Sequence, residues 1–282
     1  MGRRLGMIVL AAALASAPIA RAQALALADV LARLRAYSAA YGEQYSATVA
    51  TERYKQTSGR STFLYRETLL ESDFGIVRVP GEDRWYGFRD VYRVDGKVVQ
   101  DRGDRLGRLF SEAFDTSRQQ AKKIAEESTR FNIGPVLRTI NNPALVLEIL
   151  NPANDFRLSF SKADEDVQDG TRLWVIQFKE NYFPTLVQTS EGGDEPSEGR
   201  IWVDPLLGRL HRADVSFRSL DVRRRSFRAR LSVIFREDTK LGMWVPSKMT
   251  ERYDGSDIEE VTGDATYTDY RRFGVETRED FR

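Results

Sequence analysis

The sequence contains no cysteine and only one histidine, His211, among its 282 residues. Without cysteine, the chain cannot form a disulfide framework, a thiol nucleophile, an iron–sulfur cluster or a thiolate metal site. One histidine cannot supply the two or three imidazoles of a typical zinc site. A Gly-rich phosphate loop that opens onto a helix and a G-x-S-x-G nucleophile motif are also missing. We therefore expect no metal, no cofactor and no enzymatic activity.

The charged residues are nearly balanced, with 43 Lys and Arg against 42 Asp and Glu. A nucleic-acid-binding protein usually carries a clear basic excess, so we expect no nucleic-acid partner. Hydrophobic residues make up 41% of the chain, which is typical of a globular protein rather than a disordered one.

The first 22 residues have the pattern of an export signal. Arg3 and Arg4 precede an apolar stretch at residues 7–17, and residues 20–22 (A-R-A) match a cleavage site. The apolar stretch is shorter than the ~20 residues that span a bilayer. We predict a mature start near Gln23, a periplasmic or secreted location, and no membrane span after removal of the signal.

Removal of the signal also changes the charge and the anchoring options. Without Arg3, Arg4 and Arg21, the 43 cationic residues fall to 40 against 42 acidic ones, so the mature chain is slightly acidic. The missing cysteine also excludes a lipid-modified N-terminal cysteine.

Two regions have helical patterns. Apolar residues at three- and four-residue steps predict an amphipathic helix over residues 24–43, which Gly42 would end. Charged helix formers predict another helix over residues 115–130. Two short helices, at residues 136–140 and 144–150, are predicted between glycine and proline breaks. We interpret residues 115–150 as a helical insertion that forms a lid.

The remainder reads as closely spaced strands that are rich in Thr, Val, Tyr and Phe. The predicted strands are residues 45–55, 61–70, 75–79, 84–94, 97–100, 156–162, 171–179, 200–203, 209–217, 226–237, 244–253 and 259–273. Asp95-Gly96 is typical of a hairpin turn, because both turn residues need positive φ. The short connections predict antiparallel neighbours. Residues 173–178 are apolar on both faces, which predicts a strand covered on both sides.

Together these patterns predict an α+β protein that is mainly antiparallel β. We expect a strongly curved sheet, a half-barrel, with the N-terminal helix and short lid helices on its concave side. Residues 1–22 would be the signal peptide, and residues 23–282 a single domain with the helical insertion.

Several charged groups have a simple structural interpretation beside a functional one. His211, between Arg209 and Arg212, could be a general base but more simply lies on a solvated strand. The basic run at residues 223–225 could contact anionic headgroups or an acidic partner, or could be a charged hairpin tip that discourages edge pairing. The acidic residues near 192–199 are more simply a solvated loop.

The aromatic residues have two interpretations. Trp85, Trp174, Trp202 and Trp244 all lie on predicted strands. They could pack the core, or they could line a concave apolar surface that holds a lipid-like ligand.

The order of elements resembles the periplasmic lipoprotein-carrier superfamily, the LolA/LolB-like fold, and the chain reads as a divergent member. The resemblance is carried by the helix at 24–43, the V-D-G-K hairpin at 94–97, the strand pair at 160–178 and the segment G-R-I-W-V-D-P-L-L-G-R-L at 199–210. It implies a cavity that binds acyl chains, with helices as a gate. Carriers also have an arginine on an early strand that tethers the lid, and Arg53 lies in that region.

The leading hypothesis is an exported, non-catalytic protein that binds a lipid or an acylated protein in an apolar half-barrel cavity. The predicted lining residues are Phe63, Tyr65, Trp174, Ile176, Trp202, Phe217, Leu231, Val233 and Phe235. A strand assignment that is wrong by one residue would move a set to the other face. One alternative is an interaction or sensor module on the same fold, whose partner is an envelope protein. The other is a carboxylate-dependent hydrolase with two acids of perturbed pKa in one cleft.

Overall fold

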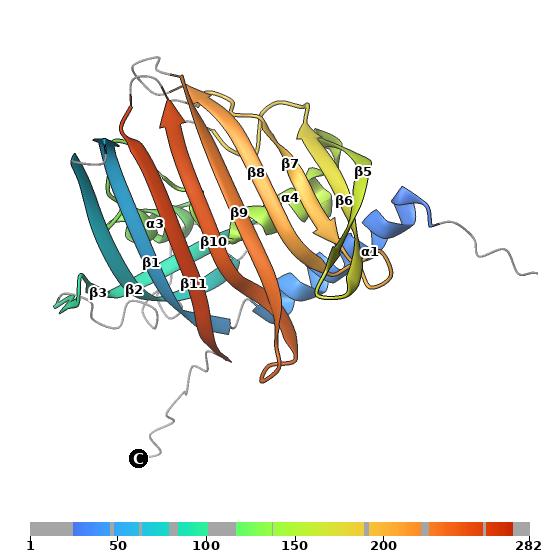
Figure 1. The fold of residues 1–282 in the computed structure, drawn as a ribbon, viewed down its shortest axis with the longest axis horizontal. Helices are drawn as coiled ribbons and strands as arrows, with labels where there is room; N and C mark the ends of the chain where they lie inside the picture. The colour runs from blue at the N-terminus through green and yellow to red at the C-terminus, as the bar shows by residue number, and fades with distance from the viewer. Residues whose placement is uncertain are drawn as a thin grey trace, which may run out of the picture.

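The sheet is one continuous antiparallel layer (Figure 1). The computed structural model describes residues 25–272 except 46–47, 62–63, 79–83, 101–116, 137, 189–191, 221–225 and 256–257. In these ranges, eleven strands are hydrogen-bonded in the order β4-β3-β2-β1-β11-β10-β9-β8-β7-β6-β5. The first strand in the sequence, β1, pairs with the last, β11, so the sheet joins the N-terminal and C-terminal halves of the chain.

The elements before the long run of C-terminal strands are α1 (Leu27–Tyr45), β1 (Thr48–Ser61), β2 (Leu64–Arg78), β3 (Trp85–Val94), β4 (Lys97–Val98), α3 (Ser117–Thr129), α4 (Ala144–Leu150) and the 3-10 helix η1 (Pro152–Arg157). The later strands are β5 (Leu158–Gln168), β6 (Thr171–Glu180), β7 (Ser197–Val203), β8 (Leu210–Leu220), β9 (Ser226–Asp238), β10 (Met243–Gly255) and β11 (Glu260–Arg272). The helices α1, α3 and α4 lie behind the sheet in Figure 1, and we call this side the covered face.

The fold class is confirmed: the protein is α+β, mainly antiparallel, and the sheet is not closed into a barrel. The predicted hairpin at Asp95-Gly96 is also confirmed, with φ values of 48° and 77°. The same pair of positive φ angles, 48° and 78°, occurs at Asp169 and Gly170 between β5 and β6. In both turns, the glycine removes the steric cost of the left-handed conformation.

Several predicted elements differ from the structure. Of the predicted strand at residues 75–79, the described residues 75–78 are not a separate strand, because they continue β2 and Gly75 pairs with both Val49 and Phe88. Of the predicted helix at residues 136–140, residue 137 lies outside the described residues, and residues 136 and 138–140 are irregular rather than helical. Gly42 does not end α1; a Cβ there would lie 2.4 Å from the Trp85 ring, so the glycine allows the indole to pack against the helix.

The covered face of the second half of the sheet is filled by the helices of the chain itself. All seven residues of α4 are buried. Leu147 and Leu150 of α4, Tyr41 of α1, and Leu210 and Phe235 of the sheet border a shared void of only about 10 Å³. That volume is close to the minimum for one water molecule. The apolar side chains of β6 to β9 are therefore in a packed core rather than at an open surface.

Residues 173–178 were predicted to be covered on both sides, and this holds for residues 173–176. Trp174 and Ile176 lie on the covered face, and Leu173 and Val175 are also buried although they point the other way. Val175 is the cross-strand neighbour of Trp202, whose half-buried indole lies on the same outer face. On the outer face of this strand, the cover thus comes from the side chain of a neighbouring strand.

The turn between β7 and β8 docks on α1. Gly208 has φ +70°, and a Cβ at this position would lie 2.5 Å from the carbonyl carbon of Arg33. Arg33 donates a hydrogen bond to the carbonyl oxygen of Pro205 at 3.1 Å. Asp204 accepts hydrogen bonds from the amides of Leu206 and Leu207, which fixes the turn. The glycine therefore sets how closely α1 approaches the sheet.

We predict that Gly208→Ala destabilises the fold much more than Gly170→Ala. Both glycines have positive φ, but a Cβ at Gly170 would meet nothing within 4 Å. Gly170→Ala should lower the free energy of unfolding by about 1 kcal/mol, the cost of a left-handed alanine. Gly208→Ala should lower it by about 3 kcal/mol or more, because α1 must also shift. Urea denaturation of both variants measures the difference, and equal losses would contradict the docking of α1 on this turn.

Candidate functional site

A cavity of about 550 Å³ lies between the start of β3, the helices α3 and α4, and residues 186–188. Its apolar wall includes Trp85 from β3, Ile124 from α3, Leu145 from α4 and Leu186 from the loop. This volume lies within the ~300–1,000 Å³ typical of pockets for small molecules and cofactors. The cavity is therefore large enough for part of an apolar ligand.

The walls of the cavity are fixed by contacts between the helices and β3. Glu148, on α4, is buried, and its carboxylate accepts a hydrogen bond from the backbone amide of Trp85. On α3, the Ser128 hydroxyl accepts a hydrogen bond from the amide of Arg89 and donates one to the carbonyl of Gly87, both at 3.1 Å. Both helices are thus attached to the same strand, and the cavity lies between the attachments.

Next to the cavity, a buried ion pair joins β1 and β3. The Arg89 guanidinium and the Glu52 carboxylate are 2.5 Å apart, with only 2% and 0% of their side chains exposed. Arg89 also donates to the carbonyl oxygen of Asn141 at 3.1 Å, and Ser72 donates to Glu52 at 2.7 Å. Burial of a charge is costly unless it is paired and hydrogen-bonded, and here both conditions are met.

A second buried ion pair fixes the segment between α3 and α4. The guanidinium of Arg138 contacts the carboxylate of Glu251, and neither side chain is exposed. Arg138 also donates to the Tyr54 hydroxyl at 2.7 Å and to the side-chain oxygen of Gln56. Asn141 donates to the Tyr54 hydroxyl at 3.1 Å. We call these five residues the Arg138 network.

The tyrosine in the network stays neutral. Burial, and then the negative charge of Glu251, raise the pKa of Tyr54 well above its usual value. The protonated hydroxyl can therefore donate to Glu251 while it accepts from Arg138 and Asn141. The network connects residues 131–142 to β1 and β10 on the covered face of the sheet.

The structure divides the nine predicted lining residues into three groups. Six lie on the covered face and are buried in the core: Trp174, Ile176, Phe217, Leu231, Val233 and Phe235. Tyr65 and Trp202 lie on the outer face, and Phe63 lies outside the described residues. None of the eight described residues lines the cavity of 550 Å³.

The placements of Tyr65 and Trp202 correct the prediction. Trp202 alternates with Ile201 and Val203, and these two take the covered face, so the indole packs outside with the Arg212 guanidinium 4.6 Å from its ring centroid. Tyr65 is 57% exposed. Its cross-strand partner is Gly59, whereas the buried residues of β1 are the even-numbered ones from Ala50 to Ser58. In both cases the strand was predicted but the face was not.

Arg53, the residue in the region where carriers have a lid-tethering arginine, does not face the helices. Arg53 lies on the outer face, 62% exposed, with Glu71 at 4.0 Å. Arg89, on β3, instead contacts the segment between the helices through the carbonyl oxygen of Asn141. The sequence offered one signal for the cavity, namely Trp85 at the start of an aromatic strand together with the apolar run in α4. It offered none for the burial of Arg89 and Arg138.

Among the other charged candidates, the acidic residues near 192–199 are not simply a solvated loop, because Glu195 is buried and Asp194 accepts a hydrogen bond from the amide of Thr185 at 2.7 Å. His211 is half-buried, with its ring centroid 4.7 Å from that of Trp244, and burial lowers the pKa of this histidine. Arg230 pairs with Asp254 across two strands, and Arg228 is exposed. Residues 223–225 lie outside the described residues. Within the described ranges, no group of three or more His, Asp or Glu side chains is placed to hold a metal ion.

Comparison with known proteins gives structural neighbours only. No protein-family profile matches the chain, and no curated protein matches its sequence. A putative outer membrane lipoprotein-sorting protein domain from Vibrio parahaemolyticus is 12% identical, with a TM-score of 0.37 over 88% of this chain and 92% of that one. A DUF1329 family protein from Desulfovibrio piger is 11% identical, with a TM-score of 0.37 over 86% and 93%.

A LolA superfamily protein, NE2245 from Nitrosomonas europaea, is 10% identical, with a TM-score of 0.34 over 84% of this chain and 93% of that one. In the part of the chain that the structure describes, no helix has the length and hydrophobicity needed to cross a bilayer.

We predict that Arg138→Met lowers the free energy of unfolding by about 3–5 kcal/mol, because it leaves the Glu251 carboxylate buried and unpaired. The double variant Arg138→Met/Glu251→Met should be more stable than Arg138→Met alone, because no buried charge remains. The control is Arg252→Met, which breaks an exposed pair with Glu260 and should cost less than about 1 kcal/mol. Urea denaturation measures all three, and similar losses for Arg138→Met and Arg252→Met would contradict the role of the network.

Proposed function

We propose that this protein is exported and binds a lipid or a lipidated protein without catalysing a reaction. The observation that carries the proposal is the cavity of about 550 Å³, which lies between two helices and the sheet and has an apolar wall. The signal pattern in residues 1–22 supports export to the periplasm or beyond, as a single mature domain. The ligand in this proposal is an acyl chain, free or attached to a partner.

Binding would depend on apolar contact. Trp85, Ile124, Leu145 and Leu186 would contact the acyl chain, and each buried Å² of apolar surface contributes roughly 25 cal/mol. Glu148, at the border, is already hydrogen-bonded to the backbone amide of Trp85. The cavity would therefore select for apolar ligand surface rather than for a specific polar group.

A longer chain would need more room than the cavity provides. The adjacent apolar surface is the covered face under α4, where Ile176, Val233 and Phe235 are now in the core. Movement of α4 away from the sheet would add that surface to the binding site. The Arg138 network would hold residues 131–142 in place during this movement, so the hinge would lie between Asn141 and α4.

The experiment that tests the proposal is native mass spectrometry of the protein purified from the envelope of cells that express the full chain. We expect an added mass that organic extraction removes, and fatty-acid or lipid species in the extract. An apo mass, together with no uptake of added fluorescent fatty acid, would show that the cavity does not bind lipid. Capture of a single envelope protein by the lipid-free protein would then favour the interaction module.

We predict that Leu186→Asp reduces uptake of a fluorescent fatty acid by about tenfold or more, because it replaces apolar wall with a charge. The matched control is Leu206→Asp, at a leucine that is 68% exposed in the β7–β8 turn and does not line the cavity. A fluorescence titration compares the two dissociation constants. Equal affinities would place the acyl site elsewhere, and circular dichroism checks that both variants are folded.

A further inference from the structure

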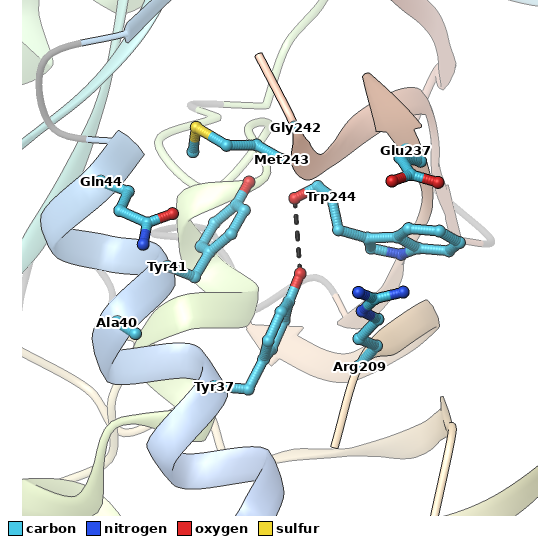
Figure 2. Close-up of a pocket in the computed structure, with 9 residues that line it drawn as sticks. All are labelled: Tyr37, Ala40, Tyr41, Gln44, Arg209, Glu237, Gly242, Met243 and Trp244. Carbon is cyan, nitrogen blue, oxygen red and sulfur yellow. Dashed lines mark hydrogen bonds between the residues drawn. The ribbon is translucent and has the colours of Figure 1, made fainter. Parts of the chain in front are cut away.

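A separate pocket of about 120 Å³ lies between α1 and the strands β8 to β10 (Figure 2). On the helix side it is lined by Tyr37, Tyr41 and Gln44. Arg209 and Trp244 line the strand side. The proposed acyl site uses none of these residues. The volume of this smaller pocket is well below the ~300–1,000 Å³ of sites for drug-sized ligands, so the pocket suits a compact group.

One buried hydroxyl in this pocket has no hydrogen-bond partner. Tyr41 is only 5% exposed, and its hydroxyl oxygen is buried without a partner in the protein. Buried polar atoms are nearly always hydrogen-bonded, so an isolated one indicates a missing partner. The Tyr41 ring packs between Tyr37 and Tyr45, with centroid distances of 6.0 and 5.2 Å. This packing prevents the ring from turning its hydroxyl away.

The hydroxyl is available as a donor. Burial, and then the neighbouring tyrosines, raise the pKa of Tyr41 well above its usual value, so it stays protonated at neutral pH. Burial also raises the pKa of Tyr37, and the charge of Arg209 opposes this effect. The Tyr37 hydroxyl already donates a hydrogen bond to the carbonyl oxygen of Trp244 at 3.5 Å (Figure 2), so Tyr41 supplies the free hydroxyl of the pocket.

Arg209 supplies a positive charge at the pocket. Its guanidinium carbon is 5.8 Å from the ring centroid of Trp244. The indole is fixed by a hydrogen bond from its nitrogen to the carbonyl of Leu210 at 2.7 Å. Figure 2 shows the indole between Arg209 and Glu237, which is the one acid that lines the pocket. The positive charge thus lies toward the tyrosines.

We propose that this pocket binds a compact phosphate-type oxyanion, held by the Arg209 guanidinium, the Tyr41 hydroxyl and the Gln44 amide. These donors come from two sides of the pocket, the helix and the strands, which suits a tetrahedral anion with several oxygens. Ring edges, which carry partial positive charge, also face anions favourably. The oxyanion could be inorganic phosphate or the phosphate of a lipid headgroup. The proposal does not depend on acyl binding at the larger cavity.

The test is a titration with inorganic phosphate, followed by phosphorus NMR and calorimetry, of the protein purified from cells that express the full chain. We expect saturable binding at millimolar concentration and weaker binding of acetate, which has only two oxygens. No saturable binding, or equal binding of acetate, would overturn the proposal.

Three variants test the assigned groups. Tyr41→Phe should weaken phosphate binding by about tenfold, because a hydrogen bond to a charged group is lost. The matched control is Tyr45→Phe, one turn further along α1, which is equally buried, does not line the pocket and should bind phosphate normally. Arg209→Gln should weaken binding by about tenfold or more. Wild-type affinity in Tyr41→Phe or Arg209→Gln would overturn the assignment.

Glu237→Gln gives a test that loss of folding cannot imitate. Glu237 is exposed, and its removal should strengthen phosphate binding severalfold by removing like-charge repulsion. An unchanged or weaker affinity would contradict an anion at this pocket. Vesicles of phosphatidic acid then identify the source: binding to vesicles that inorganic phosphate competes away supports a headgroup, and binding of inorganic phosphate alone supports a free anion.

Discussion

The buried charge of Glu251 is the constraint on which the covered face of the sheet depends. Glu251 lies on β10 with its side chain fully buried, and the cation that neutralises it, Arg138, comes from the segment between α3 and α4. An unpaired buried carboxylate would cost several kcal/mol. The sheet is therefore complete only when residues 131–142 are in place, and the positions of α3 and α4 follow from that segment.

The two ion pairs divide the covered face into different environments. Over β6 to β9 the face is apolar and α1 and α4 cover it, whereas over β1, β3 and β10 it carries Glu52, Arg89 and Glu251. A buried ion pair contributes little net stability relative to apolar packing, and its best-attested role is to fix register. A shift of β1 by one residue would turn Glu52 and Tyr54 to the outer face. The network therefore supports one alignment of β1 against its neighbours.

The sequence was sufficient to predict most strands and helices of this fold, but not which face of the sheet each side chain occupies. The hairpin at Asp95-Gly96 was predictable because two adjacent positive φ angles restrict the residue choice. The outward placement of Trp202 was not, because Ile201 and Val203 on the same strand are equally apolar. The burial of Arg138 was beyond sequence reasoning altogether, since charged residues are almost never fully buried unless paired. The partner, Glu251, is 113 residues away.

The packed apolar face limits how a ligand could reach it. All seven residues of α4 are buried, so displacement of that helix exposes apolar surface at roughly 25 cal/mol per Å². An acyl chain that takes the place of α4 would cover this surface again and recover a similar free energy. The exchange would be nearly neutral only if the chain buried as much apolar area as α4 does. The cavity between α3 and α4 needs no such exchange, because its space is already open. In the proposed function, an acyl chain would therefore occupy this cavity first and would displace α4 only if it were longer than the cavity.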